Sequence, residues 1–263
     1  MLRTVLDVLF PRTCLACDRR GWPFCAPCTA RVAGLGPPWC RRCGRSLDRE
    51  VDTCRDCPPT TIAWSRALLL YEGPVRRALM RLKFGGVRSA ADPLGAGMAG
   101  LLRTAWPSAE RGPPPVALPP KLTPPVITWV PLGPSRRRAR GYDQAELLAR
   151  AVGRFGGLPV RRTLARTRDT APQAQRAGLD RRVSLMGAFR AAGKAPPSVI
   201  LVDDILTTGA TAAACARALL SAGALEVGLL TAARSLGGAV PARCYNPRGL
   251  LPGSVVARET FSR

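Results

Sequence analysis

The most informative segment of this 263-residue chain reads Val199-Ile-Leu-Val-Asp-Asp-Ile-Leu-Thr-Thr-Gly-Ala-Thr211. Its first four residues, 199–202, are apolar and typical of a buried strand in a parallel sheet. Two adjacent acids follow, and a Thr-Thr-Gly-Ala-Thr turn leads into an Ala-rich helix that we expect to end near Ala222. Open α/β sheets bind ligands beyond the carboxyl ends of their strands. The segment therefore predicts an α/β fold with a ligand site at this turn.

The turn itself has the composition of a phosphate site. A helix start presents unpaired backbone N–H groups and a positive dipole end, and a glycine there lets the backbone approach an anion closely. An ordinary strand–helix junction with a Thr cap is the alternative, but it does not account for the two adjacent acids. The residues predicted to bind the phosphate are Thr207, Thr208, Gly209, Ala210 and Thr211.

The same segment resembles the phosphoribosyl-pyrophosphate loop of type I phosphoribosyltransferases. The resemblance implies that Asp203 and Asp204 form the catalytic pair that holds the ribose hydroxyls, while the turn holds the 5′-phosphate. It implies phosphoribosyl pyrophosphate as the ligand. Mg²⁺ is then expected to bridge the pyrophosphate and ribose oxygens.

Eight of the ten cysteines form four Cys-x-x-Cys pairs in the first 57 residues. Each pair can present two thiolates to one metal ion, so eight thiolates suggest two structural zinc ions without an open catalytic position. Sequential pairing is the simpler arrangement, but the spacing leaves crossed pairing open. Disulfides and iron–sulfur clusters are the alternatives, and the repeated knuckles together with the lack of an export signal favour zinc. The predicted ligands are Cys14, Cys17, Cys25, Cys28, Cys40, Cys43, Cys54 and Cys57.

The chain is strongly basic, with 40 Lys and Arg against 17 Asp and Glu, and it contains no His. The absence of His excludes His-based triads, His metal ligands and His general bases. The net charge of +23 suits a polyanionic partner, although a solvated Arg-rich surface is an equal alternative. No apolar run approaches the length of a membrane span, and the N-terminus does not resemble a signal peptide, so we expect a cytoplasmic protein without membrane insertion.

The middle of the chain predicts helices after Pro74 and over 90–106, a Pro-rich connector over 107–125 and a strand over 127–130. A basic loop then precedes a helix that begins near Tyr142. The planar guanidinium of Arg suits a pyrophosphate, so this loop is predicted to hold the pyrophosphate across a cleft from the turn. Its candidate residues are Arg136, Arg137, Arg138 and Arg140.

The segment between Arg166 and Phe189 is polar, Arg-rich and only weakly periodic. We expect it to form a mobile flap that excludes water from the reacting sugar. Its polar candidates are Thr170, Gln173, Gln175 and Arg182.

Taken together, residues 10–235 resemble the ComF family of competence-associated proteins. The marks are the four cysteine pairs, Leu82-Lys83-Phe84, the Arg-Gly-Tyr-Asp-Gln run over 140–144, the flap and the loop described above. The resemblance implies a double zinc ribbon over 1–62 and a phosphoribosyltransferase-like domain over 63–263. Asp143 and Ser184 depart from the family pattern, which usually has Asn at both positions.

Two functions follow from this resemblance. One is a phosphoribosyltransferase with an acceptor that the sequence does not indicate, acting in DNA uptake with DNA-uptake proteins as partners. The other is a non-catalytic protein that binds single-stranded DNA and uses the phosphoribosyl site as a sensor; a salvage-type transferase is a further alternative. Trp22, Phe24 and Trp39 are candidates for base stacking, but the small core of the ribbons is the favoured interpretation for them.

Overall fold

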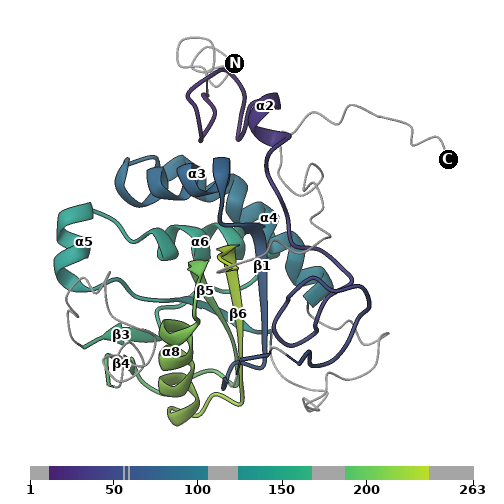
Figure 1. Cartoon of the computed structure of the whole chain (residues 1–263). Coiled ribbons are helices and arrows are strands. Elements are labelled where there is room, and N and C mark those ends of the chain that lie inside the picture. The colour runs from purple at the N-terminus through teal and green to yellow at the C-terminus, as the bar shows by residue number, and fades with distance from the viewer. Residues whose placement is uncertain (1–11, 56, 59, 106–123, 168–186, 237–263) are drawn as a thin grey trace.

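The computed structural model describes residues 12–55, 57–58, 60–105, 124–167 and 187–236. Its centre is a parallel sheet of four strands in the order β1-β6-β5-β2 (Figure 1). In chain order the strands are β1 (Trp64–Leu70), β2 (Val126–Trp129), β5 (Ser198–Leu206) and β6 (Glu226–Arg234). The α/β fold with a parallel sheet, predicted from the 199–211 segment, is confirmed.

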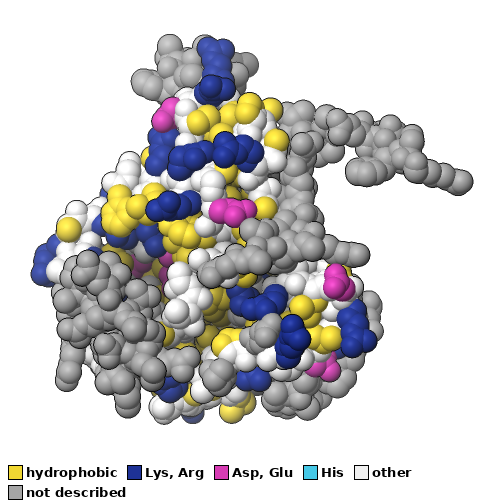
Figure 2. All heavy atoms as spheres, viewed as in Figure 1, with side chains coloured by type: hydrophobic (Ala, Val, Ile, Leu, Met, Phe, Trp, Pro, Cys, Tyr) yellow, Lys and Arg dark blue, Asp and Glu magenta, His cyan; other side chains and the backbone are white. Residues whose placement is uncertain are grey.

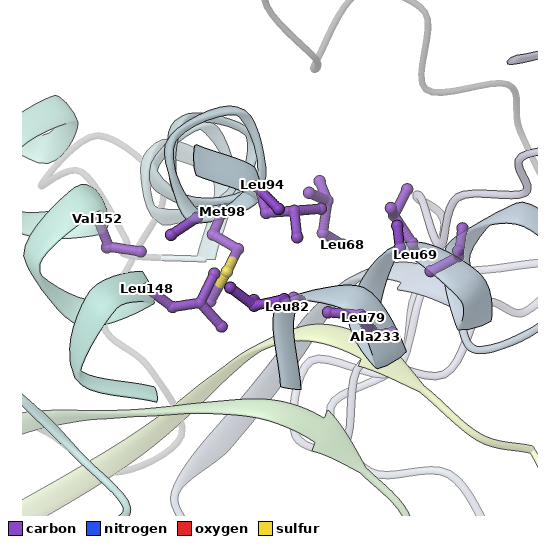
Figure 3. Packing of buried hydrophobic residues seen from close by; sticks show 14 of the residues in the cluster. Leu68, Leu69, Leu79, Leu82, Leu94, Met98, Leu148, Val152 and Ala233 are labelled. Atoms are coloured by element: carbon purple, nitrogen blue, oxygen red, sulfur yellow. The ribbon is translucent and has the colours of Figure 1, made fainter. Parts of the chain in front are cut away.

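Helices cover both faces of this sheet, as its buried, largely apolar strands require. One face packs against α3, α4 and α6, whose side chains form the larger core cluster with Leu68, Leu69 and Ala233 of the sheet (Figure 3). The other face packs against α8 and a small antiparallel pair, β3 and β4. The bounds are α3 (Gly73–Phe84), α4 (Ala91–Ala105), α6 (Gln144–Gly156), α8 (Ala210–Ser221), β3 (Leu164–Arg166) and β4 (Phe189–Ala191).

The basic stretch after β2 is a helix, not the loop that the sequence suggested. This helix, α5 (Pro134–Arg140), starts with a proline in its first turn and ends at Gly141, which has a φ of 75°. Four of the five residues 136–140 are arginines, so this segment has no apolar periodicity and the usual helix signal is missing. The arginines therefore lie on a mostly exposed helix surface.

Other predictions fall partly or wholly on residues that the structure does not describe. The flap candidates Thr170, Gln173, Gln175 and Arg182, and the family-pattern position Ser184, lie outside the described residues, as does 107–123 of the Pro-rich connector. The strands β3 and β4 at the two ends of the flap pair with each other. Among the described residues, none of the helices has the length and hydropathy of a membrane span.

The N-terminal region contains the helix α2 (Ala26–Thr29) and the four cysteine knuckles, and it packs directly against the α/β unit. Leu15 and Phe24 belong to the same buried cluster as Leu79 and Leu82 of α3. Trp39 is only 5% exposed and joins this cluster as well. Phe24 and Trp39 are therefore core residues, and Trp22, which is half-buried beneath Arg12, packs against the same core.

Candidate functional site

The eight N-terminal cysteines form two separate four-sulfur clusters. In each, all four Sγ atoms lie within 4.8 Å of one another. The first cluster joins the first and second knuckles and the second joins the third and fourth, so the pairing is sequential rather than crossed. The members are Cys14, Cys17, Cys25 and Cys28 in one, and Cys40, Cys43, Cys54 and Cys57 in the other.

The acid–base properties of these thiols fit a structural cation. A hydrogen bond from the Arg19 backbone N–H lowers the pKa of Cys17 to about 7. Burial tends to raise the pKa of Cys40, but backbone N–H groups of Cys43 and Cys54 lower it to about 7. Burial and neighbouring sulfurs raise the pKa of Cys28 to about 12. Full deprotonation of four adjacent thiols needs a cation that offsets their repulsion, and a four-thiolate donor set suits zinc.

The first ribbon docks on α3. The Nε of Arg77 donates a hydrogen bond of 3.1 Å to the Ala16 carbonyl, and Arg81 forms an ion pair of 2.6 Å with Asp18. Leu15 is buried beneath these polar contacts. This ribbon is thereby connected to α3, whose last turn carries both Arg81 and Lys83.

The second ribbon docks on the edge strand β1. The backbone N–H of Ser65 donates to the Arg42 carbonyl at 2.7 Å, and the Ser65 hydroxyl donates to the Cys43 carbonyl at 2.9 Å. The buried Arg66 donates from Nη1 to the Arg41 carbonyl at 2.7 Å, and its burial lowers its pKa to about 10. The knuckle carbonyls are therefore hydrogen-bonded to the sheet, which fixes the ribbon in place.

The predicted phosphate turn lies between the end of β5 and the start of α8. Gly209 adopts a φ of 75° and is the N-cap residue of α8, a conformation that favours glycine. A small cavity of about 40 Å³ lies against the turn, and its lining includes Asp203, residues 205–212, Leu229 and Thr231. The structure thus brings one of the two acids and all five predicted turn residues together.

The two acids face opposite sides of β5, because side chains alternate along a strand. Asp203 lines the small cavity, whereas the lining of that cavity does not include Asp204. Asp204 is 4% exposed, and its Oδ2 lies 3.1 Å from Nζ of Lys83, an ion-pair contact that lacks hydrogen-bond geometry. Burial and the adjacent Asp204 raise the pKa of Asp203 well above its ordinary value, although Asp203 keeps some solvent exposure.

The arginines of α5 do not line either of the two cavities at the turn. Arg136, Arg137 and Arg138 are exposed on α5, and Arg137 pairs with Glu146 at 3.3 Å. Arg140 lies over the ring of Phe84, with 4.8 Å between its Cζ and the ring centroid, and donates to Gln144. Phe84 is 67% exposed at the end of α3. Arg140 thus lies beside the helix end that carries the Lys83 contact to Asp204.

Asp143, one of the departures from the family pattern, has a structural place. It is 3% exposed and caps α6, with Oδ1 accepting from the backbone N–H groups of Ala145 and Glu146. Its Oδ2 accepts from the Leu132 N–H at 2.8 Å, which connects the end of β2 to α6. Burial raises the pKa of this carboxyl.

A larger cavity, of about 190 Å³, separates the second ribbon from the phosphate turn. Its lining includes Arg42, Arg217 and Arg234, none of which the sequence singled out. Arg42 follows a cysteine knuckle in the sequence and Arg217 lies on α8, so only the docking of the ribbon on the sheet brings them close together. Figure 2 shows Lys and Arg side chains far outnumbering Asp and Glu on the visible face, in line with the overall charge.

The N-terminal cysteine region matches a known domain family. A family model of the double zinc ribbon domain matches residues 5–58. Together with the two cysteine clusters and the parallel sheet, this match defines an α/β protein with an N-terminal double zinc ribbon, the architecture predicted from the sequence.

Curated relatives named for DNA utilization and competence match most of this chain. The DNA utilization protein YhgH of Salmonella typhi is 29% identical over 221 residues, which cover 82% of this chain and 92% of that protein. Competence protein F of Haemophilus influenzae is 28% identical, covering 81% of this chain and 90% of that protein, and competence protein ComFC of Bacillus subtilis is 25% identical, covering 80% and 84%. Over about four fifths of its length the chain is thus similar to proteins named for competence and DNA utilization.

Solved structures give weaker likenesses. The allosteric regulatory enzyme of purine biosynthesis matches with a TM-score of 0.34 and 19% identity, covering 54% of this chain and 26% of that structure. The glutamine phosphoribosylpyrophosphate amidotransferase of Bacillus subtilis matches with a TM-score of 0.32 and 23% identity, over the same shares. The chain thus spans about a quarter of the length of those two proteins.

Proposed function

We propose that this chain binds phosphoribosyl pyrophosphate with Mg²⁺ at the Asp203–Thr211 segment, in a phosphoribosyltransferase-like domain over 63–263 that follows a zinc-binding ribbon domain over 1–62. The observation that carries the proposal is the small cavity that Asp203 shares with the turn at the start of α8. A helix start with Gly209 in the left-handed region suits the 5′-phosphate, and the carboxylate of Asp203 near the end of the preceding strand suits the ribose hydroxyls.

Mg²⁺ fits this proposal through the chemistry of the donors. Carboxylate and phosphate oxygens are the ligands that Mg²⁺ prefers, and Asp203 offers a carboxylate at the cavity. When bound, the ion supplies charge neutralisation to a departing pyrophosphate. Asp204, held by Lys83, positions the end of β5 from the opposite face. We propose pentosyl transfer to an acceptor as the reaction.

Thermal unfolding with and without the ligand tests this proposal. A ligand at one hundred times its Kd stabilises the native state by about 2.7 kcal/mol, so phosphoribosyl pyrophosphate with Mg²⁺ should raise the melting temperature by several degrees. Gly209→Ala puts a Cβ on a left-handed residue of the turn, which costs about 1–2 kcal/mol, and it should remove most of this ligand-induced rise.

The matched control is Gly157→Ala. Gly157 has a φ of 67° at the end of α6, so its replacement carries a similar conformational cost away from the turn. The control should melt lower by a similar amount and keep the full ligand-induced rise. Equal ligand-induced shifts in both variants would contradict a phosphate site at the turn.

A second function, binding of single-stranded DNA, is favoured by one specific arrangement. Phe84 is 67% exposed with Arg140 stacked on it, one residue from Lys83 and its contact to Asp204. An exposed ring beside an arginine is suited to stack a base while the cation attracts the backbone. The relatives named for competence and DNA utilization suggest the same kind of partner, and we place the chain's role in the handling of incoming single strands.

Replacement of the exposed ring tests this second function. Phe84→Ala should weaken binding of a fluorescent oligonucleotide about tenfold, in line with about 1–3 kcal/mol for one stacked base. Phe155→Ala is the control, because Phe155 is also exposed (47%) and also carries a stacked arginine, Arg154, but lies at the far end of α6. An equal loss in both variants would argue against a defined stacking position at Phe84.

A further inference from the structure

We propose that the second zinc ribbon is part of the phosphoribosyl site and supplies Arg42 to the phosphate that the Thr207–Thr211 turn binds. This inference rests on the proposed function and deepens it. Its basis is the larger cavity, about 190 Å³, which has the turn on one wall and the second ribbon on the other. The ribbon wall is made of Arg42, Cys43, Cys57, Pro58 and Thr60.

The charge of the cavity indicates the class of ligand. Three arginines contribute to its lining, Arg42, Arg217 and Arg234, while none of its lining residues is an Asp or Glu. The backbone of the turn adds the positive end of α8 to the same space. A phosphate-bearing ligand is therefore the class that fits. This cavity shares the 206–210 segment with the small cavity at Asp203, so one ligand can touch both.

Arg42 is held at the cavity wall by its own contacts. Its Nη2 donates to the Thr60 carbonyl at 3.0 Å, and its carbonyl accepts from the Ser65 N–H at 2.7 Å. A guanidinium carries five N–H donors in a fixed plane, so one internal hydrogen bond orients the group while it contacts an anion. Arg42 is half-buried, which strengthens such a contact relative to one in open solvent.

The ribbon is also fixed in position relative to the turn. Arg234 at the end of β6 donates from Nη1 to the Cys43 carbonyl at 2.6 Å, and the Ser235 N–H donates to the Leu206 carbonyl at 2.9 Å. A Cβ on Gly44 would lie 2.4 Å from the Ser65 carbonyl oxygen, so the knuckle approaches β1 as closely as glycine permits. The cavity therefore has two walls connected through β6, and the ribbon wall depends on the knuckle that carries Cys43.

The test compares two adjacent arginines of that knuckle. Arg42→Gln should weaken calorimetric binding of phosphoribosyl pyrophosphate with Mg²⁺ at least tenfold, because it removes a charged donor from the cavity. Arg41→Gln is the control, since Arg41 does not line the cavity and its side chain pairs with Glu50 at 2.7 Å and Asp52 at 3.2 Å instead. The control should bind within about twofold of the wild type.

Zinc content and melting temperature, measured on both variants, show whether each is folded and metal-loaded. Unchanged affinity in Arg42→Gln, with a wild-type chain that binds normally, would overturn the inference and leave the proposed function standing. A metal-loaded wild-type chain that does not bind the ligand at all would overturn both. A tenfold loss in Arg42→Gln alone would support a site built from ribbon and sheet together.

Discussion

Replacement of Asp203 and Asp204 together by Asn is expected to abolish Mg²⁺-dependent binding of phosphoribosyl pyrophosphate. Asp203 lies in the cavity beside the turn, and Asp204 holds the same strand end through Lys83. The double replacement removes the carboxylate at the cavity and the buried carboxylate that anchors the strand end to Lys83, so the affinity should fall at least a hundredfold. Calorimetry measures the change. An unchanged affinity in the double variant would contradict a role for the two acids in ligand binding.

The single variant Asp203→Asn separates function from stability. Burial and Asp204 raise the pKa of Asp203 in the folded chain above its ordinary value of 3.8. The folded state therefore holds this proton more tightly than the unfolded state. Ionisation of Asp203 thus costs stability as the pH rises above about 4.

Asp203→Asn removes this cost while also removing a ligand contact. The variant should melt above the wild type at neutral pH, and this difference should shrink as the pH is lowered towards 4. A lower melting temperature than the wild type across the whole pH range would contradict the assigned direction of the pKa shift.

The second large effect concerns the metal clusters. Replacement of Cys40 and Cys43 by Ser should reduce the zinc content from two ions per chain to one, because it removes half of the second four-sulfur set. Structural zinc sites contribute about 10–16 kcal/mol of apparent binding free energy, so the second ribbon should unfold locally and become sensitive to proteolysis. Elemental analysis and limited proteolysis measure both outcomes.

The matching change in the first cluster, Cys14→Ser with Cys17→Ser, is the control. It should also leave one zinc ion, but it should expose α3 rather than β1, since Arg77 and Arg81 connect the first ribbon to that helix. A wild-type chain that holds fewer than two zinc ions after metal loading would contradict the assignment of the clusters.

Local signals predicted the parts of the fold that are built from contiguous residues. The apolar run before Asp203, the Thr-Thr-Gly turn and the Ala-rich helix form β5 and α8 in the predicted order. The strand extends to Leu206, so both acids lie inside it and face opposite sides of the sheet. The sequence predicted the two acids as one pair and did not indicate this separation. The grouping of the cysteines followed the simpler sequential expectation.

Long-range contacts explain what the sequence did not predict. The strand β1 contains Ser65 and Arg66, polar residues that are buried because they hydrogen-bond the second ribbon, and this weakens its strand signal. The arginines of α5 were assigned to the pyrophosphate from their chemistry alone, yet those lining the larger cavity are Arg42, Arg217 and Arg234. Their proximity depends on tertiary docking, which is not encoded in any local motif.

The most direct test of the central claim is isothermal titration calorimetry of the zinc-loaded wild-type chain with phosphoribosyl pyrophosphate, with and without added Mg²⁺. We predict binding of one ligand per chain in the presence of Mg²⁺ and a marked loss of affinity without it. A chain that holds two zinc ions, unfolds cooperatively and still shows no binding heat at several temperatures in Mg²⁺ would contradict the claim that the 203–211 segment is a phosphoribosyl site.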